Sequence, residues 1–159
     1  MAENLEFVVG IEQNCIQILD NARQFAREIA SEVSNKIIDK TPVDTGVTKA
    51  NWMGNIGAPS EDTTGSADPS GSATKAAVEE KIKNWDVLKE DFYLTNNTPQ
   101  AVVLEFGLYP NPPLRGTYIP RGKSKHGIAG PRWVKFSQNG YSKLAPHGMV
   151  GVTLSEMNG

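Results

Sequence analysis

The chain has 159 residues, a length that fits one domain. Its net charge of −2 excludes the class of strongly basic proteins that bind nucleic acid with their whole surface. Its one cysteine excludes an internal disulfide, and its 15 glycines and 10 prolines predict long loops. The amino terminus has no basic region followed by an apolar run, so we expect no signal peptide. No apolar stretch approaches the roughly 20 residues of a membrane span. We therefore expect a protein that is made in a reducing cytoplasm and does not contact membranes.

The clearest predicted element is a helix over about residues 11–39. Apolar side chains recur in it at spacings of three and four, which places them on one face. They are Ile11, Cys15, Ile18, Ala22, Ala26, Ile29, Val33 and Ile37. We expect this face to be buried, with Cys15 as a structural thiol in the core. Pro42 ends the helix, because the residue before a proline is disfavoured in the α region.

A tight turn at residues 41–46 follows the helix. We expect Asp44 to bond the backbone downstream of it and Gly46 to take a positive φ. Residues 48–56 then alternate between apolar and polar, which predicts a half-buried strand packed on the helix. The inward face would hold Ala50, Trp52 and Ile56, and the solvent face Lys49, Asn51 and Asn55.

The middle of the chain alternates between a loop, a helix and a strand. Residues 57–74 are rich in Gly, Ser, Thr, Asp and Pro, a composition typical of a flexible loop. Helical spacing of apolar residues predicts a second helix over about 74–89, and a second strand is expected over about 91–96.

The last predicted elements are two short helices. Thr98 is expected to cap the first of them, with proline in its first turn and Gly107 ending it. Residues 148–157 favour a short carboxy-terminal helix, with a strand as the competing prediction. The sequence thus predicts a single α+β domain over residues 1–159, in which a long amino-terminal helix packs on a small antiparallel sheet with long loops.

Residues 109–143 hide a charge asymmetry. They carry seven basic residues and no Asp or Glu, so they contribute +7, and the rest of the chain must contribute −9 to give −2. The segment is either a solvated loop or an extended basic contact loop that docks on an acidic neighbour or on phosphate. We favour the contact loop, because a structureless loop of this length is uncommon without a function. The proposed contact residues are Arg115, Arg121, Lys123, Lys125, Arg132 and Lys135.

No catalytic or metal-binding constellation stands out. His126 and His147 lie on loops without metal-ligand spacing, and Cys15 lies on the apolar stripe. The paired carboxylates Glu79 and Glu80 are typical of a solvated helix face, and no glycine pattern matches a phosphate loop. We expect no enzyme activity, no cofactor and no metal.

Three segments in series resemble a family of phage tail-completion and head–tail joining proteins of long-tailed bacteriophages. The first block is the turn Thr-Pro-Val-Asp-Thr-Gly at 41–46 with Lys-Ala-Asn-Trp at 49–52. The second is Leu-Thr-Asn-Asn-Thr-Pro at 94–99 with Leu-Glu-Phe-Gly at 104–107, where Gln100 departs from the family's aromatic. The third is residues 141–150. The motif residues are Pro42, Asp44, Gly46, Trp52, Asn96, Asn97, Gly107 and Pro146.

This resemblance implies a small α+β virion protein that forms a ring, often a hexamer, at the head-proximal end of the tail. Such a ring caps the tail tube protein and contacts the head connector and its adaptors, while DNA passes through without specific binding. It is assembled in the host cytoplasm. We expect five of the motif residues to maintain turns and core, and not to touch partners: Asp44, Gly46, Trp52, Asn96 and Gly107.

Other functions stay open at the level of sequence. One is a minor tail protein, or a connector-side stopper, elsewhere in the virion. Another is a nucleic-acid-binding module that uses the basic segment, whose binding would fall steeply with salt. A hydrolase is the third, although no constellation favours it.

Overall fold

The computed structural model describes residues 2–109 and 137–158. Nine elements follow one another along these residues. They are α1 (Ala2–Lys40), α2 (Val47–Ala50), β1 (Met53–Ile56), α3 (Ser72–Asn84), β2 (Phe92–Thr95), α4 (Pro99–Phe106), β3 (Ser137–Gln138), β4 (Tyr141–Ser142) and α5 (Val150–Met157). The predicted α+β class, with a long amino-terminal helix on a small antiparallel sheet, is confirmed. None of the described helices is long and apolar enough to cross a membrane.

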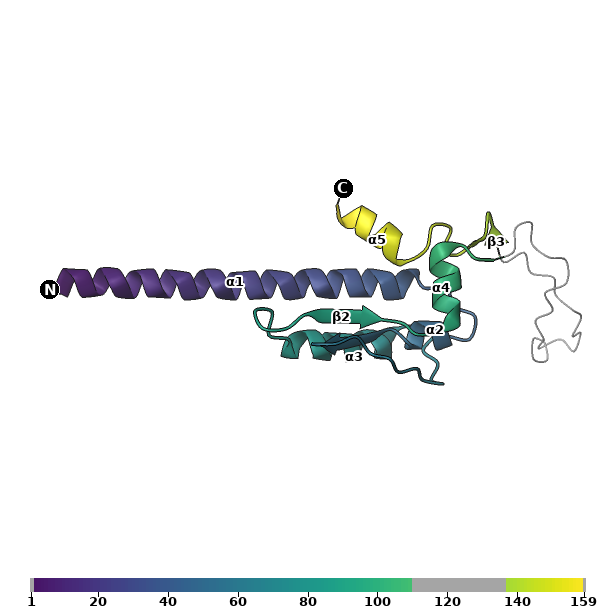
Figure 1. The fold of residues 1–159 in the computed structure, drawn as a ribbon, viewed down its shortest axis with the longest axis horizontal. Coiled ribbons are helices and arrows are strands. Elements are labelled where there is room, and N and C mark those ends of the chain that lie inside the picture. The colour runs from purple at the N-terminus through teal and green to yellow at the C-terminus, as the bar shows by residue number, and fades with distance from the viewer. Residues whose placement is uncertain (1, 110–136, 159) are drawn as a thin grey trace, which may run out of the picture.

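Helix α1 is the longest element of the described chain, with 39 residues and a length of about 58 Å at 1.5 Å per residue. Only its carboxy-terminal part lies against the rest of the protein, and the amino-terminal part projects away from it (Figure 1). The predicted helix over 11–39 is therefore correct in kind, but it begins nine residues earlier than expected.

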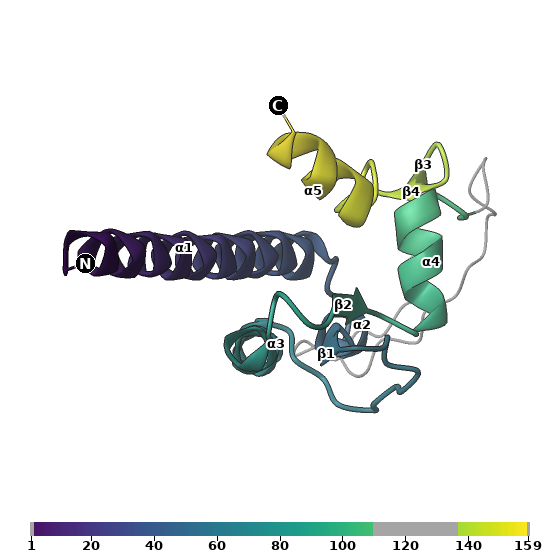
Figure 2. The same cartoon turned by 60° about the vertical axis from the view of Figure 1, so that its left-hand side comes forward.

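The sheet consists of β1 and β2, paired antiparallel with Met53 opposite Thr95 and Ile56 opposite Phe92. Helix α3 packs on both β1 and α1, whereas α5 lies against α1 and α4 lies against β4. Figure 2 shows that α3 and α5 flank α1 on different sides. A second, two-residue hairpin joins β3 to β4 through a turn with positive φ at Asn139 and Gly140, the Asn-Gly signal of a tight hairpin.

The core forms where the end of α1 meets these elements. Ile38 is 0% exposed and is the largest of the fully buried side chains. The other buried apolar side chains of the cluster are Ile37, Trp52, Val78, Ile82, Leu104, Ala145 and Met149. The cluster draws on α1, α3, α4 and the segment before α5, so one end of α1 organises nearly every element.

The expected strand over residues 48–56 is only half correct. Residues 47–50 form the helical turn α2, because Gly46 has φ near 90° and its carbonyl accepts the amide of Ala50 at 3.0 Å. The strand starts at Met53. Because of this turn, Lys49 and Asn51 are buried although they were predicted to face solvent, whereas Trp52 is buried as predicted.

Helix α3 ends at Asn84, before the predicted end near residue 89. The backbone becomes extended at Trp85, whose ring packs on Phe92 with centroids 5.6 Å apart. The indole nitrogen donates to the carbonyl of Glu90 at 2.6 Å. Placing this large side chain against the sheet thus takes precedence over continuing the helix.

The loop predicted over residues 57–74 has no helix or strand up to Gly71, all of it within the described chain, and α3 begins at Ser72. It is tied to the body at Thr64, whose amide donates to Asn51 Oδ1 at 2.6 Å and whose carbonyl accepts from Asn51 Nδ2 at 3.0 Å. A loop of this composition therefore follows a defined course across the sheet.

The two short helices are confirmed as α4 and α5, and the competing carboxy-terminal strand is wrong. Gly107 ends α4 in the left-handed region with φ 64°, as expected. Thr98 is the N-cap residue of α4, as predicted, but its hydroxyl donates to Asn96 Oδ1 at 2.7 Å and does not accept a helix amide.

The expected burial of the α1 stripe holds only for its last turns. Val33 and Ile37 join the core, but Ile11, Ile18 and the thiol-bearing Cys15 are exposed. The prediction that Cys15 is a buried structural thiol is therefore wrong. The body is simply too short to cover a helix of this length.

We expect Ile38→Ala to lower the free energy of unfolding by about 2–5 kcal/mol, because it leaves a cavity at the junction of the elements. The isomeric side chain of Leu88 is 53% exposed. The control Leu88→Ala should cost less than about 1 kcal/mol. Urea denaturation followed by circular dichroism measures both, and equal losses would show that the core is not centred on Ile38.

Candidate functional site: the corner where three sequence blocks meet

The first block of the family-like motif closes the carboxy-terminal end of α1. The indole nitrogen of Trp52 donates to Thr41 Oγ1 at 2.8 Å, and that hydroxyl donates to the carbonyl of Ile37 at 2.8 Å. All three groups are buried. A chain of two hydrogen bonds thus fixes the helix end to the start of the sheet.

Gly46 is required by the same turn. A Cβ built on it would lie 2.6 Å from the backbone nitrogen of Pro69, and its positive φ disfavours any other residue. The carbonyl of Gly46 also accepts the amide of Asp68 at 3.1 Å. The loop before α3 therefore crosses directly over this glycine.

The second block joins β2 to the first through side-chain amides. Asn96 Nδ2 donates to the carbonyl of Thr48 at 2.8 Å, while its Oδ1 accepts the amide of Thr98 at 3.1 Å. Asn97 Nδ2 donates to the carbonyls of Ser60 and Asp62 at 2.7 and 3.1 Å. The two asparagines hold the loop on one side and α2 on the other.

The third block packs against the end of α4. A Cβ on Gly107 would lie 2.6 Å from the ring of Tyr141, so a side chain there would displace the hairpin. The carboxylate of Glu105 accepts the amides of Met149, Val150 and Gly151 at 2.7, 2.8 and 2.8 Å. A negative charge on the first amides of α5 also suits the positive pole of that helix.

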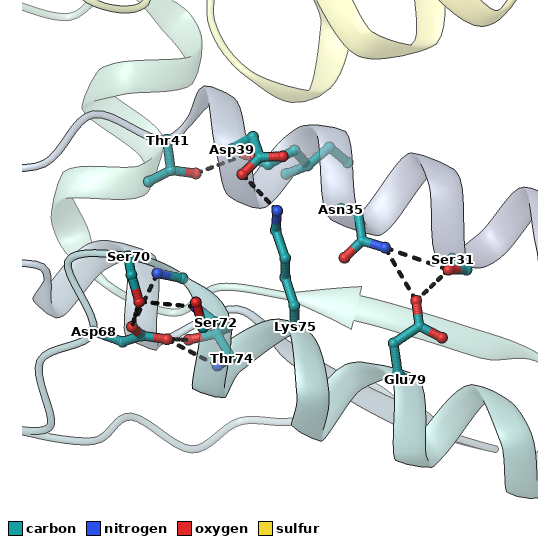
Figure 3. A network of polar contacts seen from close by, with 12 residues as sticks. Ser31, Asn35, Asp39, Thr41, Asp68, Ser70, Ser72, Thr74, Lys75 and Glu79 are labelled. Atoms are coloured by element: carbon teal, nitrogen blue, oxygen red, sulfur yellow. Dashed lines mark hydrogen bonds and ion pairs between the residues drawn. The ribbon is translucent and has the colours of Figure 1, made fainter.

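Asp68 performs a similar task for α3 (Figure 3). Its carboxylate accepts the amides of Gly71 and Thr74 at 2.9 Å each, and the hydroxyls of Thr74 and Ser70 at 2.9 Å each. The bond from the Thr74 amide is the main cause that holds the pKa of Asp68 well below its usual range. The ionised side chain is thus a structural part of the helix start.

The remaining motif residues lie at the surface of this corner. Asp44 is exposed, and within the described chain its side chain makes no hydrogen bond, so the predicted bond to the downstream backbone is wrong. Thr45 Oγ1 instead accepts the amide of Val47 at 3.4 Å.

Burial raises the pKa of Tyr109, and the negative charge of Asp44 raises it further. Pro42 is half-buried and Pro146 is exposed.

An open groove of about 590 Å³ runs between α1 and α3 and is lined mainly by charged and amide side chains. Ser31 donates to the Glu79 carboxylate, which also accepts from Asn35 Nδ2 at 3.0 Å (Figure 3). These bonds, with the ion pair of Lys75 and Asp39 at 2.6 Å, hold the two helices together. The groove contains no histidine or cysteine that could activate the serine, so its geometry supports helix packing.

The described residues contain no cluster of three or more His, Cys, Asp or Glu side chains that could hold a metal ion. His147 lies 6.4 Å from the ring of Tyr141, centroid to centroid, in a tilted arrangement. The six basic residues predicted to form contacts, from Arg115 to Lys135, lie outside the described residues, as does His126.

Sequence reasoning missed the two carboxylates that anchor helix starts. Asp68 stands in a Ser, Pro and Gly context a few residues before α3, which is a signal for a helix start. No local sequence pattern around Glu105 indicates its role, because the amides that it binds lie 44–46 residues further along the chain. Asn51, 0% exposed, was assigned to solvent because the alternating pattern was extended across a turn.

Comparison with known proteins adds no relative to this picture: no protein-family model matches the sequence, and neither a curated protein nor a solved structure matches it.

We expect Glu105→Ala to destabilise the protein by about 1–3 kcal/mol, since three amides at the start of α5 lose a charged acceptor. Hydrogen exchange should accelerate most at residues 149–151. The matched control is Glu80→Ala, an exposed helix carboxylate. Comparable loss in both variants would contradict an anchoring role for Glu105.

The Asp68→Asn variant should show a pH-dependent loss of stability. Because the folded pKa is depressed, the carboxylate contributes fully above the unfolded value of about 3.9 and loses its contribution as the pH falls further. The difference in Tm from the wild type should thus be largest near neutral pH and shrink below pH 4. Asp62→Asn, at an exposed position, is the control. A gap that stays constant from pH 7 to pH 3 would exclude this role.

Proposed function

We propose that this chain is a structural protein of a long-tailed phage virion. In this proposal it completes the tail and joins it to the head connector, as a ring through which DNA passes. The observation that carries the proposal is the series of three motif blocks, which lie far apart in sequence yet meet in one corner of the fold. Trp52, Asn96 and Gly107 each make a contact there that depends on that residue type.

These contacts favour the family-like interpretation over a chance match of short motifs. Three short motifs that matched by chance would have no reason to pack together. The blocks instead fix α1, the sheet and α5 relative to one another. The contacts of Trp52, Asn96 and Gly107 support the fold, and in this proposal partners bind to other residues.

The charge distribution supports passage of DNA without tight binding. Outside residues 109–143 the chain carries a net charge of −9. A ring lumen lined by this acidic part would repel phosphate and let the duplex slide. The basic segment would then face a neighbouring subunit or the connector.

The test is negative-stain electron microscopy of particles made when the gene carries an early stop codon. We expect full heads beside separate or misformed tails, because the joining ring is missing. The control is the same phage complemented with the intact gene on a plasmid, which should restore joined particles.

Two other outcomes would replace the proposal. Joined particles with an altered tail would favour a minor tail protein. Intact, infectious particles would contradict any joining role. The nucleic-acid-binding alternative would then be tested by measuring how the affinity of the purified chain for DNA falls between 50 and about 200 mM salt.

A further inference from the structure

The amino-terminal part of α1, residues 5–26, is here called the arm; it projects from the body, and its last two turns border the groove beside α3. Nine large apolar side chains on it are 43–69% exposed. They are Leu5, Phe7, Val8, Val9, Ile11, Ile16, Ile18, Leu19 and Phe25. Such a contiguous apolar surface is rare on a monomer and marks a binding surface.

The amount of apolar surface on the arm fits one side of a stable interface. With about 150–200 Å² for a whole large side chain, roughly half exposed, the arm presents on the order of 800 Å². That is close to what each partner buries in a standard protein–protein interface, about 800 Å². The arm is about 33 Å long, enough to cross a small domain.

The width of the apolar face indicates the kind of partner. At 100° per residue the nine side chains span about 200° of the helix circumference, from Phe7 and Phe25 round to Val9. A two-stranded coiled coil buries only a narrow seam, whereas a helix packed on a domain buries a broader stripe. The arm therefore fits the body of a partner better than a second, identical helix.

A second, smaller surface with exposed apolar side chains lies at the opposite end of the same molecule. Both views place α4 at the far end from the amino terminus of α1 (Figures 1 and 2). The exposed apolar side chains Val102, Phe106, Leu108 and Leu144 lie on α4 and on the segments that contact it, and we call them the α4 patch. Their exposed fractions run from 49% to 71%.

The charges of the two surfaces are also complementary. The arm carries three carboxylates and one arginine, a net charge of −2. The exposed Lys143 adjoins Leu144 in the α4 patch. The acidic arm attracts the positive charge of Lys143, whereas two acidic arms brought together would repel.

We propose that the arm of one subunit docks on the α4 patch of the next copy of this chain. Two complementary surfaces at opposite ends of one molecule make a heterologous contact, and such contacts close into a ring when the rotation permits. This inference deepens the proposed function by naming the contact between neighbouring subunits. It depends on the proposal that the chain forms a ring, but not on the proposal that the ring is part of a virion.

Disulfide trapping tests the contact with the native thiol. Cys15 is exposed on the arm, and Leu144→Cys adds a second thiol in the α4 patch. Mild oxidation of this variant should give a ladder of covalent oligomers that ends in one closed species. The wild type, with Cys15 alone, and the control Leu88→Cys should stay monomeric on a denaturing gel.

Light scattering on full-length protein provides an independent readout. The wild type should be an oligomer, and both Ile18→Glu and Phe106→Glu should reduce it to the 17.3 kDa monomer. Leu88→Glu should leave the oligomer intact. All three side chains are more than half exposed, so the variants should keep the wild-type circular dichroism spectrum.

Several results would overturn the inference. A covalent dimer of the wild type would show that arm pairs with arm. Dissociation by Ile18→Glu but not by Phe106→Glu would place the arm on another surface, and a monomeric wild type would exclude the contact. None of these results would decide whether particles lacking the protein fail to join, so the proposed function is tested separately.

Discussion

The burial of the last turns of α1 is the constraint on which the rest of the structure depends. Ile37 and Ile38 belong to one buried cluster with side chains from α3, α4 and the segment before α5, so one helix end joins the layer of α3 and the sheet to the carboxy-terminal elements. A small domain can bury only part of its surface, and this one concentrates what it buries at a single junction. Polar bonds then fix the angles, with Trp52 on Thr41 and the Lys40–Glu156 ion pair at 2.8 Å.

Local signals in the sequence predicted the elements that depend on local physics. The period of α1, the glycine after α4 and the proline that ends α1 were sufficient, because each acts within a turn or two. The same signals failed where tertiary contacts decide. Asn51 alternates with apolar neighbours yet is buried, because it bonds a loop 13 residues further along. Burial of Cys15 was predicted from periodicity, but periodicity shows only which face is apolar, not whether anything covers it.

The sequence predicted which residues belong to the site, but it did not predict how they are arranged in space. Short motifs identified Trp52, Asn96 and Gly107, but the sequence does not show that they share one corner or that Glu105 spans to α5. Each of these residues contacts a different part of the fold: Trp52 contacts Thr41, Asn96 contacts Thr48 and Gly107 lies against Tyr141. In the proposed assembly the arm lies far from the motif residues, whereas the α4 patch includes Phe106 of the second block and Leu144 of the third.

The arm has a consequence for the life of the free subunit. A helix of about 20 residues would barely hold together alone in water, but here the anchored turns of α1 supply the nucleus from which it extends. While the arm is uncovered, proteases can cleave it, and chaperones or exposed apolar surfaces of other proteins can bind its apolar face. In the proposed assembly, a subunit whose arm is uncovered would be degraded sooner than an assembled one, so excess subunits would be removed and not stored.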